Sequence, residues 1–355
     1  MSDSKSLLED VIPSAPWTAA LSPTSDSKTG TAFPQAIAHR GFKAMCPENS
    51  LEAMRAAVEA GAHGLETDVH LSRDGVVVLS HDPSLKRCFG VDAKIADCDW
   101  EFLASLRTTR APGVRMIRFV DLLAWLCEPG VRHVWVLLDI KISDKADDLI
   151  PALVDAFAAV QGDIPWEKRF VLGCWNATYL TKTRLLLPSF PLSHISFSPS
   201  YTSHFLAKLP NLGVNMLQRS LAGFSGPAFL RRCSVLDSDV DEDDKDGQLR
   251  PLFVWTVNDV RWMEWCLRNN ASAGAPGKRC IDGVITDDPR LFLEVCRRWE
   301  SGEEGGGDGG CRAQEGWGQW ARTGLDLMVV RIFRFGLFWA RRFSGRFDYL
   351  DEVQR

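Results

Sequence analysis

Residues 64–82 read GLETDVHLSRDGVVVLSHD and combine acidic and histidine side chains with a strongly β-prone, apolar background. The first half alternates as a β-strand does, so Glu66, Asp68 and His70 share one face and mostly apolar side chains occupy the other. A strand with this composition belongs in a core. Acids on a core strand need partners, because burying unpaired charge is costly. The stretch therefore predicts a strand that carries polar groups into a functional site.

Short apolar runs of the same kind recur from residue 36 onward and are separated by helix-like stretches such as SLEAMRAAVEAGA and ADDLIPALVDAFAAV. The runs are AIAHR, GLETDVHLS, VVVLSHD, VWVLLDIK, RFVLGCW, HISFSPS, GVNMLQ, LFVWTVN and DGVIT. Buried-type strands that alternate with helices indicate a parallel sheet. Eight or nine such units over about 260 residues favour an α/β fold of the TIM (β/α)8 type. One step breaks the alternation, since residues 72–76 are too few for a helix.

The overall composition narrows the class of protein and its compartment. The 355 residues are 45% hydrophobic and 25% charged, and the formal net charge of −5 argues against nucleic-acid binding as the main function. The ten cysteines form no CxxC pair, and no cationic and apolar leader opens the sequence. We therefore expect free thiols, an intracellular location and no secretion.

The chain divides into four parts by composition. Residues 1–34 are polar and expected to be mostly disordered, residues 35–300 form the barrel, residues 301–318 are a Gly-rich linker, and residues 319–355 form a basic tail. The acidic run at 237–248 is expected to be a surface insertion, because it lacks the spacing of a calcium-binding EF-hand loop.

Polar residues follow several predicted strands, where the C-terminal ends of a parallel barrel converge on one face. They are His39, Arg40, Glu66, Asp68, His81, Asp82, Asp139, Lys141 and Asn258. Glu66, Asp68 and Asp139 would repel one another unless a cation lies between them. Carboxylate oxygens suit a hard divalent ion, so the three acids predict a site for Mg²⁺ or Ca²⁺.

Histidines and basic residues add to this pattern. His39 and His81 on different strands suit paired general acid and base catalysis near neutral pH. Arg40 and Lys141 provide fixed positive charge that suits a phosphate. Together with the metal, these groups describe metal-assisted cleavage of a phosphodiester.

Four other residues lie in or near these motifs, and three of them have two open interpretations each. His70 either supports the metal site or is packed in the core. Asp82 is expected to orient the His81 loop rather than bind metal. Glu48, in CPENS, either belongs to the site or lies at a helix start, and Trp255 either lines the substrate pocket or belongs to the core.

The stretch AHRGFKAMCPENSLEAMRAAVEAGAHGLETDVHLSRDGVVVLSHD resembles the N-terminal signature of glycerophosphodiester phosphodiesterases, and LLDIK, VWTVND and DGVITDDP resemble its later motifs in the right order. The resemblance covers about residues 36–296. It implies a TIM barrel of the phospholipase C-like phosphodiesterase type. Two departures are Asp139 in place of the usual Glu of LEIK and Ser50 in place of the Thr of PENT.

The resemblance also implies residue roles. Glu66, Asp68 and Asp139 would bind the metal, and His39 and His81 would be the acid and base. Arg40 and Lys141 would contact the phosphate, and Glu48 would lie in the pocket.

Within the family, the layout is similar to the fungal phosphatidylglycerol-specific phospholipase C branch, which implies cleavage of phosphatidylglycerol to diacylglycerol and glycerol phosphate. One alternative is a soluble enzyme that acts on deacylated glycerophosphodiesters. Another is an inactive barrel that binds lipid as a scaffold, although a scaffold has no need to keep His39, His81, Glu66 and Asp68 together.

The tail sequence TGLDLMVVRIFRFGLFWARRFSGRF decides between these enzymes. At 100° per residue, Arg331, Arg334, Arg341 and Arg342 fall in one sector, and Trp339 lies with bulky apolar residues on the opposite side. This basic amphipathic pattern is typical of a helix in a membrane interface. We expect a detached tail that binds an anionic phospholipid surface on mitochondria, the endoplasmic reticulum or lipid droplets. A helix that packs back on the barrel and a monotopic hairpin or short span are the alternatives.

Overall fold

The computed structural model describes residues 11–23, 30–223, 226–234, 250–271, 281–302 and 336–353. The acidic run 237–248, most of the predicted linker and the two tail residues Arg331 and Arg334 lie outside the described residues.

Eight parallel strands form a closed barrel, as the sequence predicts. Strand β1 pairs with β2 on one side and with β9 on the other, and this double pairing closes the sheet. The strands are β1 Gln35–His39, β2 Gly64–Leu71, β4 Trp135–Ile140, β5 Phe170–Cys174, β6 Leu192–Ser196, β7 Gly213–Leu217, β8 Leu252–Trp255 and β9 Gly283–Thr286. Each coincides with a run predicted from the sequence.

The predicted break in the alternation is confirmed after β2. The short strand β3, Val77–Leu79, turns back and pairs with β2 in antiparallel register, with Val69 opposite Leu79. The chain between β3 and α5 then forms a small satellite core around Val78, Leu103 and Met116, which the sequence analysis did not anticipate.

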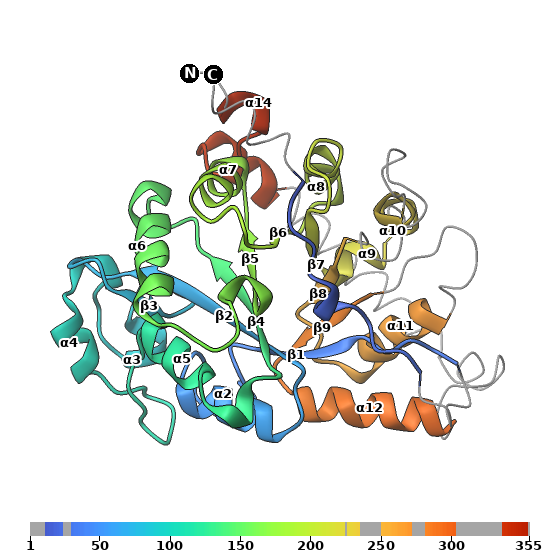
Figure 1. The fold of residues 1–355 in the computed structure, drawn as a ribbon, viewed down its shortest axis with the longest axis horizontal. Coiled ribbons are helices and arrows are strands. Elements are labelled where there is room, and N and C mark those ends of the chain that lie inside the picture. The colour runs from blue at the N-terminus through green and yellow to red at the C-terminus, as the bar shows by residue number, and fades with distance from the viewer. Residues whose placement is uncertain are drawn as a thin grey trace.

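Helices cover the outside of the barrel, as Figure 1 shows. They are α2 Leu51–Glu59, α3 Lys86–Phe89, α4 Trp100–Ser105, α5 Phe119–Leu126, α6 Ala146–Ala159, α7 Ala177–Leu186, α8 Pro199–Leu206, α9 Gln218–Leu221, α10 Gly226–Ser234, α11 Val260–Ala271, α12 Pro289–Ser301 and α14 Leu350–Val353. The 3₁₀ turns are η1 Pro16–Thr18, η2 Ile95–Asp97, η3 Pro129–Val131 and η4 Trp166–Lys168. The main hydrophobic core lies between these helices and the strands.

A second core fills the barrel interior with Ile37, Trp135, Phe253 and their neighbours. Glycine makes room for the indole, since a Cβ at Gly64 would lie 2.8 Å from the Trp135 ring. Ala15 joins this interior core, and the Gln35 amide at the start of β1 donates hydrogen bonds to backbone carbonyls of the same N-terminal segment. The segment therefore covers the N-terminal end of the barrel. The expectation of disorder is wrong for the described residues 11–23.

The C-terminal segment, residues 336–353, consists of a helix over 336–343 and a return to α14, and it lies beside α7 and α8 (Figure 1). Phe347 is fully buried and stacks on Tyr201 of α8 with ring centroids 4.8 Å apart. The Asp348 carboxylate accepts hydrogen bonds from the amides of Ala177 and Thr178 at the start of α7. The expectation of a detached tail is therefore wrong for residues 336–353, because apolar burial and this helix cap attach them to the barrel.

Two of the predicted membrane-binding arginines lie in this segment and contact protein. Arg341 lies over aromatic rings of the barrel, and Arg342 pairs with Glu352. The apolar side of the helix exposes Trp339 by 41% and Phe343 by 83%. Within the described residues, no helix combines the length and apolar character needed to cross a bilayer.

Phe347→Ala tests the attachment of this segment. We expect it to lower the free energy of unfolding by about 3–5 kcal/mol, the usual cost of emptying a buried aromatic site, or to release the segment to proteolysis. Phe343→Ala is the matched control, because the same residue type four positions earlier is exposed and should change stability by less than about 0.5 kcal/mol. Urea denaturation and limited proteolysis measure both. Equal effects of the two substitutions would contradict the observed packing.

Candidate active site

The C-terminal ends of the barrel strands surround a pocket of about 100 Å³. Its lining includes His39, Arg40, Glu66, Asp68, His81, Asp139, Lys141 and Trp255, all of which the sequence analysis placed among the site candidates, together with Trp175, Ile195, Asn215, Thr256 and Ile285. The structure thus brings together residues from the first barrel strand to the last, from His39 of β1 to Ile285 of β9. Glu48 does not line the pocket, but it binds Arg40, which does.

The three carboxylates meet because of strand register. Asp68 of β2 lies directly opposite Asp139 of β4, and Glu66 lies opposite His39 of β1. All three acids are buried, and one oxygen from each lies within 4.8 Å of the others. Asp139 takes part in this cluster although it is one methylene shorter than the Glu of the family motif.

Two cations are held against these acids. Arg40 Nε lies 3.1 Å from Asp68, and Lys141 Nζ lies 2.7 Å from Asp68 and 2.5 Å from Asp139. Burial alone would raise the pKa of Asp68, but Lys141 and Arg40 outweigh it and hold this pKa below its usual value. Arg40 and Lys141 are thus first of all counter-charges of the acidic cluster in this structure.

The cluster fits a divalent cation. Three carboxylates face two cationic side chains, which leaves one negative charge uncompensated when all acids are ionised. Burial and the neighbouring Asp68 raise the pKa of Glu66 well above its ordinary value, which disfavours its charged form until more positive charge arrives. Carboxylate oxygens are the ligand type that both Mg²⁺ and Ca²⁺ prefer.

A strained turn after β1 supports the cluster. Arg40 has a φ of +56° and Asn49 has a φ of +54°, values that are uncommon outside glycine. The turn directs the Arg40 amide to Glu66, at 3.0 Å, and the Asn49 side-chain amide to Asp68, at 2.9 Å. Gly41, with a φ of +78°, has no room for a side chain, since a Cβ would lie 2.6 Å from the Ala53 backbone. The turn residues therefore fix two of the three acids of the cluster.

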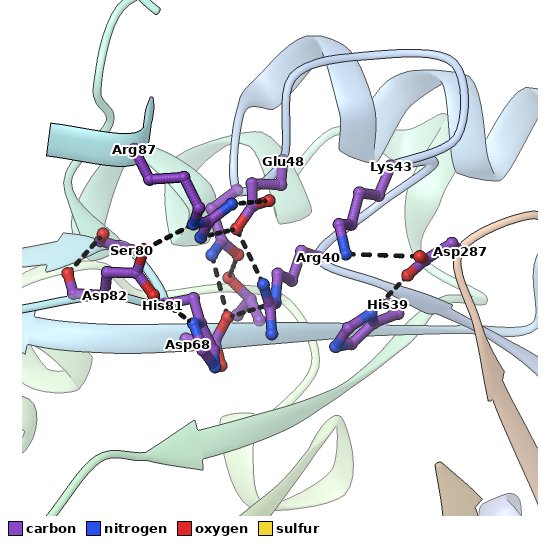
Figure 2. Close-up of polar contacts among 12 residues, drawn as sticks. His39, Arg40, Lys43, Glu48, Asp68, Ser80, His81, Asp82, Arg87 and Asp287 are labelled. Carbon is purple, nitrogen blue, oxygen red and sulfur yellow. Dashed lines mark hydrogen bonds and ion pairs between the residues drawn. The ribbon is translucent and has the colours of Figure 1, made fainter. Parts of the chain in front are cut away.

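His39 is oriented by Asp287, a residue that the sequence analysis did not assign. Its Nδ1 lies 2.5 Å from the Asp287 carboxylate, which also contacts Lys43 and Asn258. Figure 2 shows Asp287 between Lys43 and His39. Burial lowers the pKa of His39 despite the opposing effect of Asp287, so the imidazole is neutral near pH 7. The sequence offered one signal, because Asp287 directly follows a predicted strand, but its partner His39 is brought near only by the pairing of β9 with β1.

His81 has a similar arrangement on the other side of the pocket. Its Nδ1 lies 2.7 Å from Asp82, as the sequence analysis expected for an orienting acid. Arg87 connects Asp82 to Glu48, and Glu48 in turn binds Arg40 at 2.9 Å (Figure 2). Burial would raise the pKa of Glu48, but Arg87 and Arg40 lower it to about 2, so this acid is ionised. The Glu48–Arg87 pair thereby connects the His81 loop to Arg40.

His70 is buried and contacts the backbone of the His81 loop. Its Nδ1 contacts Asp144 at 2.5 Å, and its Nε2 lies 3.1 Å from the backbone carbonyl of His81. Of its two open interpretations, the structure favours support of the site. The other histidines, His63, His133, His194 and His204, do not line the pocket.

Two indoles complete the wall. Trp175 follows β5 and donates its Nε1–H to Asp139 at 2.7 Å, and Trp255 donates to the Asn215 carbonyl at 3.1 Å. Their rings meet edge to face with centroids 5.8 Å apart. Trp255 therefore both lines the pocket and packs against the interior core. Trp175 was not predicted, since no motif marks it.

Comparisons with known proteins agree with this geometry. The chain is 25% identical to a glycerophosphodiester phosphodiesterase of Caldanaerobacter subterraneus subsp. tengcongensis over 74% of this chain and 97% of that protein. It is 26% identical to the human lysophospholipase D GDPD3 over 71% of this chain and 81% of that protein. A phosphodiesterase of Oleispira antarctica, solved in complex with the product sn-glycerol-3-phosphate, has a similar fold with a TM-score of 0.55 and 22% identity over 74% of this chain and 97% of that one.

The family match covers most of the chain. Residues 39–291 match the glycerophosphoryl diester phosphodiesterase family, a span that begins at His39 and includes Asp287. The motif residues of that span are the ones gathered in the pocket. The chain therefore belongs to the glycerophosphoryl diester phosphodiesterase family and is a phosphoric diester hydrolase.

Proposed function

We propose that the chain is a metal-dependent phospholipase C that cleaves glycerophospholipid at a membrane surface, with phosphatidylglycerol as substrate and diacylglycerol and glycerol phosphate as products. One observation carries the membrane part of the proposal. The exposed pair Trp339 and Phe343 belongs to a segment that packs on the loops after β5 and β6, at the same end of the barrel as the pocket. A surface bound by this pair would face the catalytic end.

The acidic cluster would hold the metal. A divalent ion such as Mg²⁺ or Ca²⁺, bound by Glu66, Asp68 and Asp139, would supply positive charge to the phosphodiester. Arg40 and Lys141 would then be shared between the acids and the phosphate oxygens, because the ion takes over part of the compensation of the carboxylates.

The two histidines would move protons. Each has its Nδ1 engaged by a carboxylate, Asp287 for His39 and Asp82 for His81, which leaves Nε2 for the reacting atoms. One imidazole would take the proton of the nucleophile, either water or the vicinal hydroxyl of the substrate glycerol. The other would protonate the leaving oxygen.

A headgroup panel tests the function. Purified full-length protein with Mg²⁺ or Ca²⁺ is offered diacyl lipids with several headgroups and their deacylated counterparts, and the products are identified. We expect diacylglycerol and glycerol phosphate from phosphatidylglycerol. A preference for deacylated diesters would establish the soluble alternative, release of phosphatidate would indicate cleavage on the other side of the phosphorus, and no hydrolysis at all would indicate the scaffold.

Glu66→Gln tests the metal site. Turnover should be lost, as it should be reversibly with EDTA, and Mg²⁺ or Ca²⁺ should raise the melting temperature of the wild type but not of the variant. The metal-free variant should be at least as stable as the wild type near pH 7. The reason is that burial raises the pKa of Glu66, so ionising this carboxyl costs free energy that glutamine avoids. Glu52→Gln, on the exposed side of α2, is the matched control. Full activity of metal-free protein would contradict the assignment.

Asp287→Asn tests the role of His39 through pH dependence. The carboxylate stabilises the imidazolium, so its removal should lower the pKa of His39 further, and the limb of the pH–rate profile that reports His39 should move to lower pH. A shift of the acidic limb would identify His39 as the base, and a shift of the alkaline limb would identify it as the acid. Asp288→Asn is the control, since asparagine caps α12 as well as aspartate does. An unchanged profile would show that Asp287 does not act on catalysis.

Replacing both Trp339 and Phe343 by Ala tests the membrane contact. Sedimentation with phosphatidylglycerol vesicles and activity on bilayer lipid should fall, while activity on a short-chain soluble diester should stay. Phe102→Ala is the control, because this exposed aromatic lies on α4. Arg331→Gln and Arg334→Gln should weaken binding to anionic vesicles by about 1 kcal/mol each. Undiminished vesicle binding by the double variant would mean that this pair is not the membrane contact.

A further inference from the structure

Trp175 joins the metal site to the C-terminal segment. Its Nε1–H holds one oxygen of Asp139, while Lys141 holds the other oxygen. The Lys141 ammonium also lies 5.8 Å from the centre of the Trp175 ring. The orientation of Asp139, the third acid of the cluster, thus depends on where the indole lies.

Arg341 of the C-terminal segment lies against the same indole. Its guanidinium carbon is 5.3 Å from the ring centre of Trp175, 5.6 Å from that of Phe197 and 5.4 Å from that of Phe347. Burial lowers the pKa of this guanidinium, yet among the described residues no carboxylate pairs with it. Cation–π contacts with three rings therefore stabilise the charge at this place, together with the longer-range attraction of Asp139.

The segment that carries Arg341 is fixed to both sides of the Trp175 loop. Asn176, the next residue, donates its side-chain amide to the Arg346 carbonyl at 2.8 Å. Asp348 caps α7, which begins two residues after Trp175. Phe347 is stacked on Tyr201 of α8. The loop that positions the indole is thus held in place by a segment that lies about 170 residues away in the sequence.

We propose that Arg341 is a positioning residue of the active site, which holds the Trp175 indole against Asp139 and so makes the metal site depend on the docked C-terminal segment. The inference rests on the proposed metal-dependent function. The inference extends that function by making the metal site depend on residues 336–353, although the family match ends at residue 291.

The test compares Arg341→Gln, Arg341→Lys and the control Arg115→Gln, whose side chain is exposed and does not line the pocket. Calorimetric titration with Mg²⁺ alone measures affinity for the ion, and kcat and KM on a short-chain soluble diester measure catalysis. We expect Arg341→Gln to weaken Mg²⁺ binding and lower kcat by about tenfold, the scale of losing support for a metal ligand. Lysine should restore part of the loss, because it keeps the cation, and Arg115→Gln should behave as the wild type.

A double-mutant cycle separates positioning from packing. Trp175→Phe keeps a ring but removes the Nε1–H, so it should also weaken Mg²⁺ binding, and adding Arg341→Gln should cost little more. If Arg341→Gln lowers the melting temperature but leaves Mg²⁺ affinity and kcat unchanged, Arg341 only packs and the inference is wrong. The Mg²⁺ titration does not depend on hydrolysis. A wild type that binds Mg²⁺ but hydrolyses no diester would therefore refute the proposed function, and the titration would still decide the role of Arg341.

Discussion

Three buried carboxylates within a few ångströms of one another are the constraint on which the catalytic end of this barrel depends. Such a cluster is stable only if positive charge is supplied at fixed positions, because the low polarity of the surroundings magnifies both repulsion and attraction. Arg40 and Lys141 supply two charges against three carboxylates, so one negative charge is left uncompensated when all three acids are ionised. A phosphodiester hydrolase can use this imbalance, since the same deficit favours binding of a metal ion.

Barrel closure brings the catalytic groups to this cluster. The pairing of β1 with both β2 and β9 places His39 beside Glu66 on one side and Asp287 on the other, although Asp287 lies near the end of the barrel sequence. The antiparallel hairpin β2–β3 brings His81 back over the strand that carries Asp68. The two oriented imidazoles therefore reach the same pocket, His39 from the end of β1 and His81 from the loop after β3.

The sequence analysis predicted the barrel, the runs that form its strands and the charged residues and histidines of the pocket, because these follow from strand periodicity and from motifs that lie directly at strand ends. It missed Trp175, and it left Asp287 unassigned within DGVITDDP, because both act through partners that only the closed fold brings near. The packing of residues 11–23 was also missed, and the packing of residues 336–353 on the barrel was given only as an alternative to a membrane-bound tail. Their composition resembles that of solvated or membrane-bound segments, and their stabilisation comes from contacts such as Ala15 in the barrel interior and Phe347 on Tyr201.

The short helix at 336–343 presents different residues on its two sides. Arg341 is about 200° away from both Trp339 and Phe343, so the arginine faces the barrel while the aromatic pair faces outward. Under the two proposals, one rigid element would contact the bilayer and hold the indole that positions Asp139. Any ordering of this helix by lipid would then favour metal binding, and metal binding would favour the ordered helix to the same extent, because coupling between two binding equilibria is reciprocal. A docked helix that both contacts the bilayer and positions Asp139 through Trp175 would restrict full activity to the membrane surface, where a lipid substrate is found.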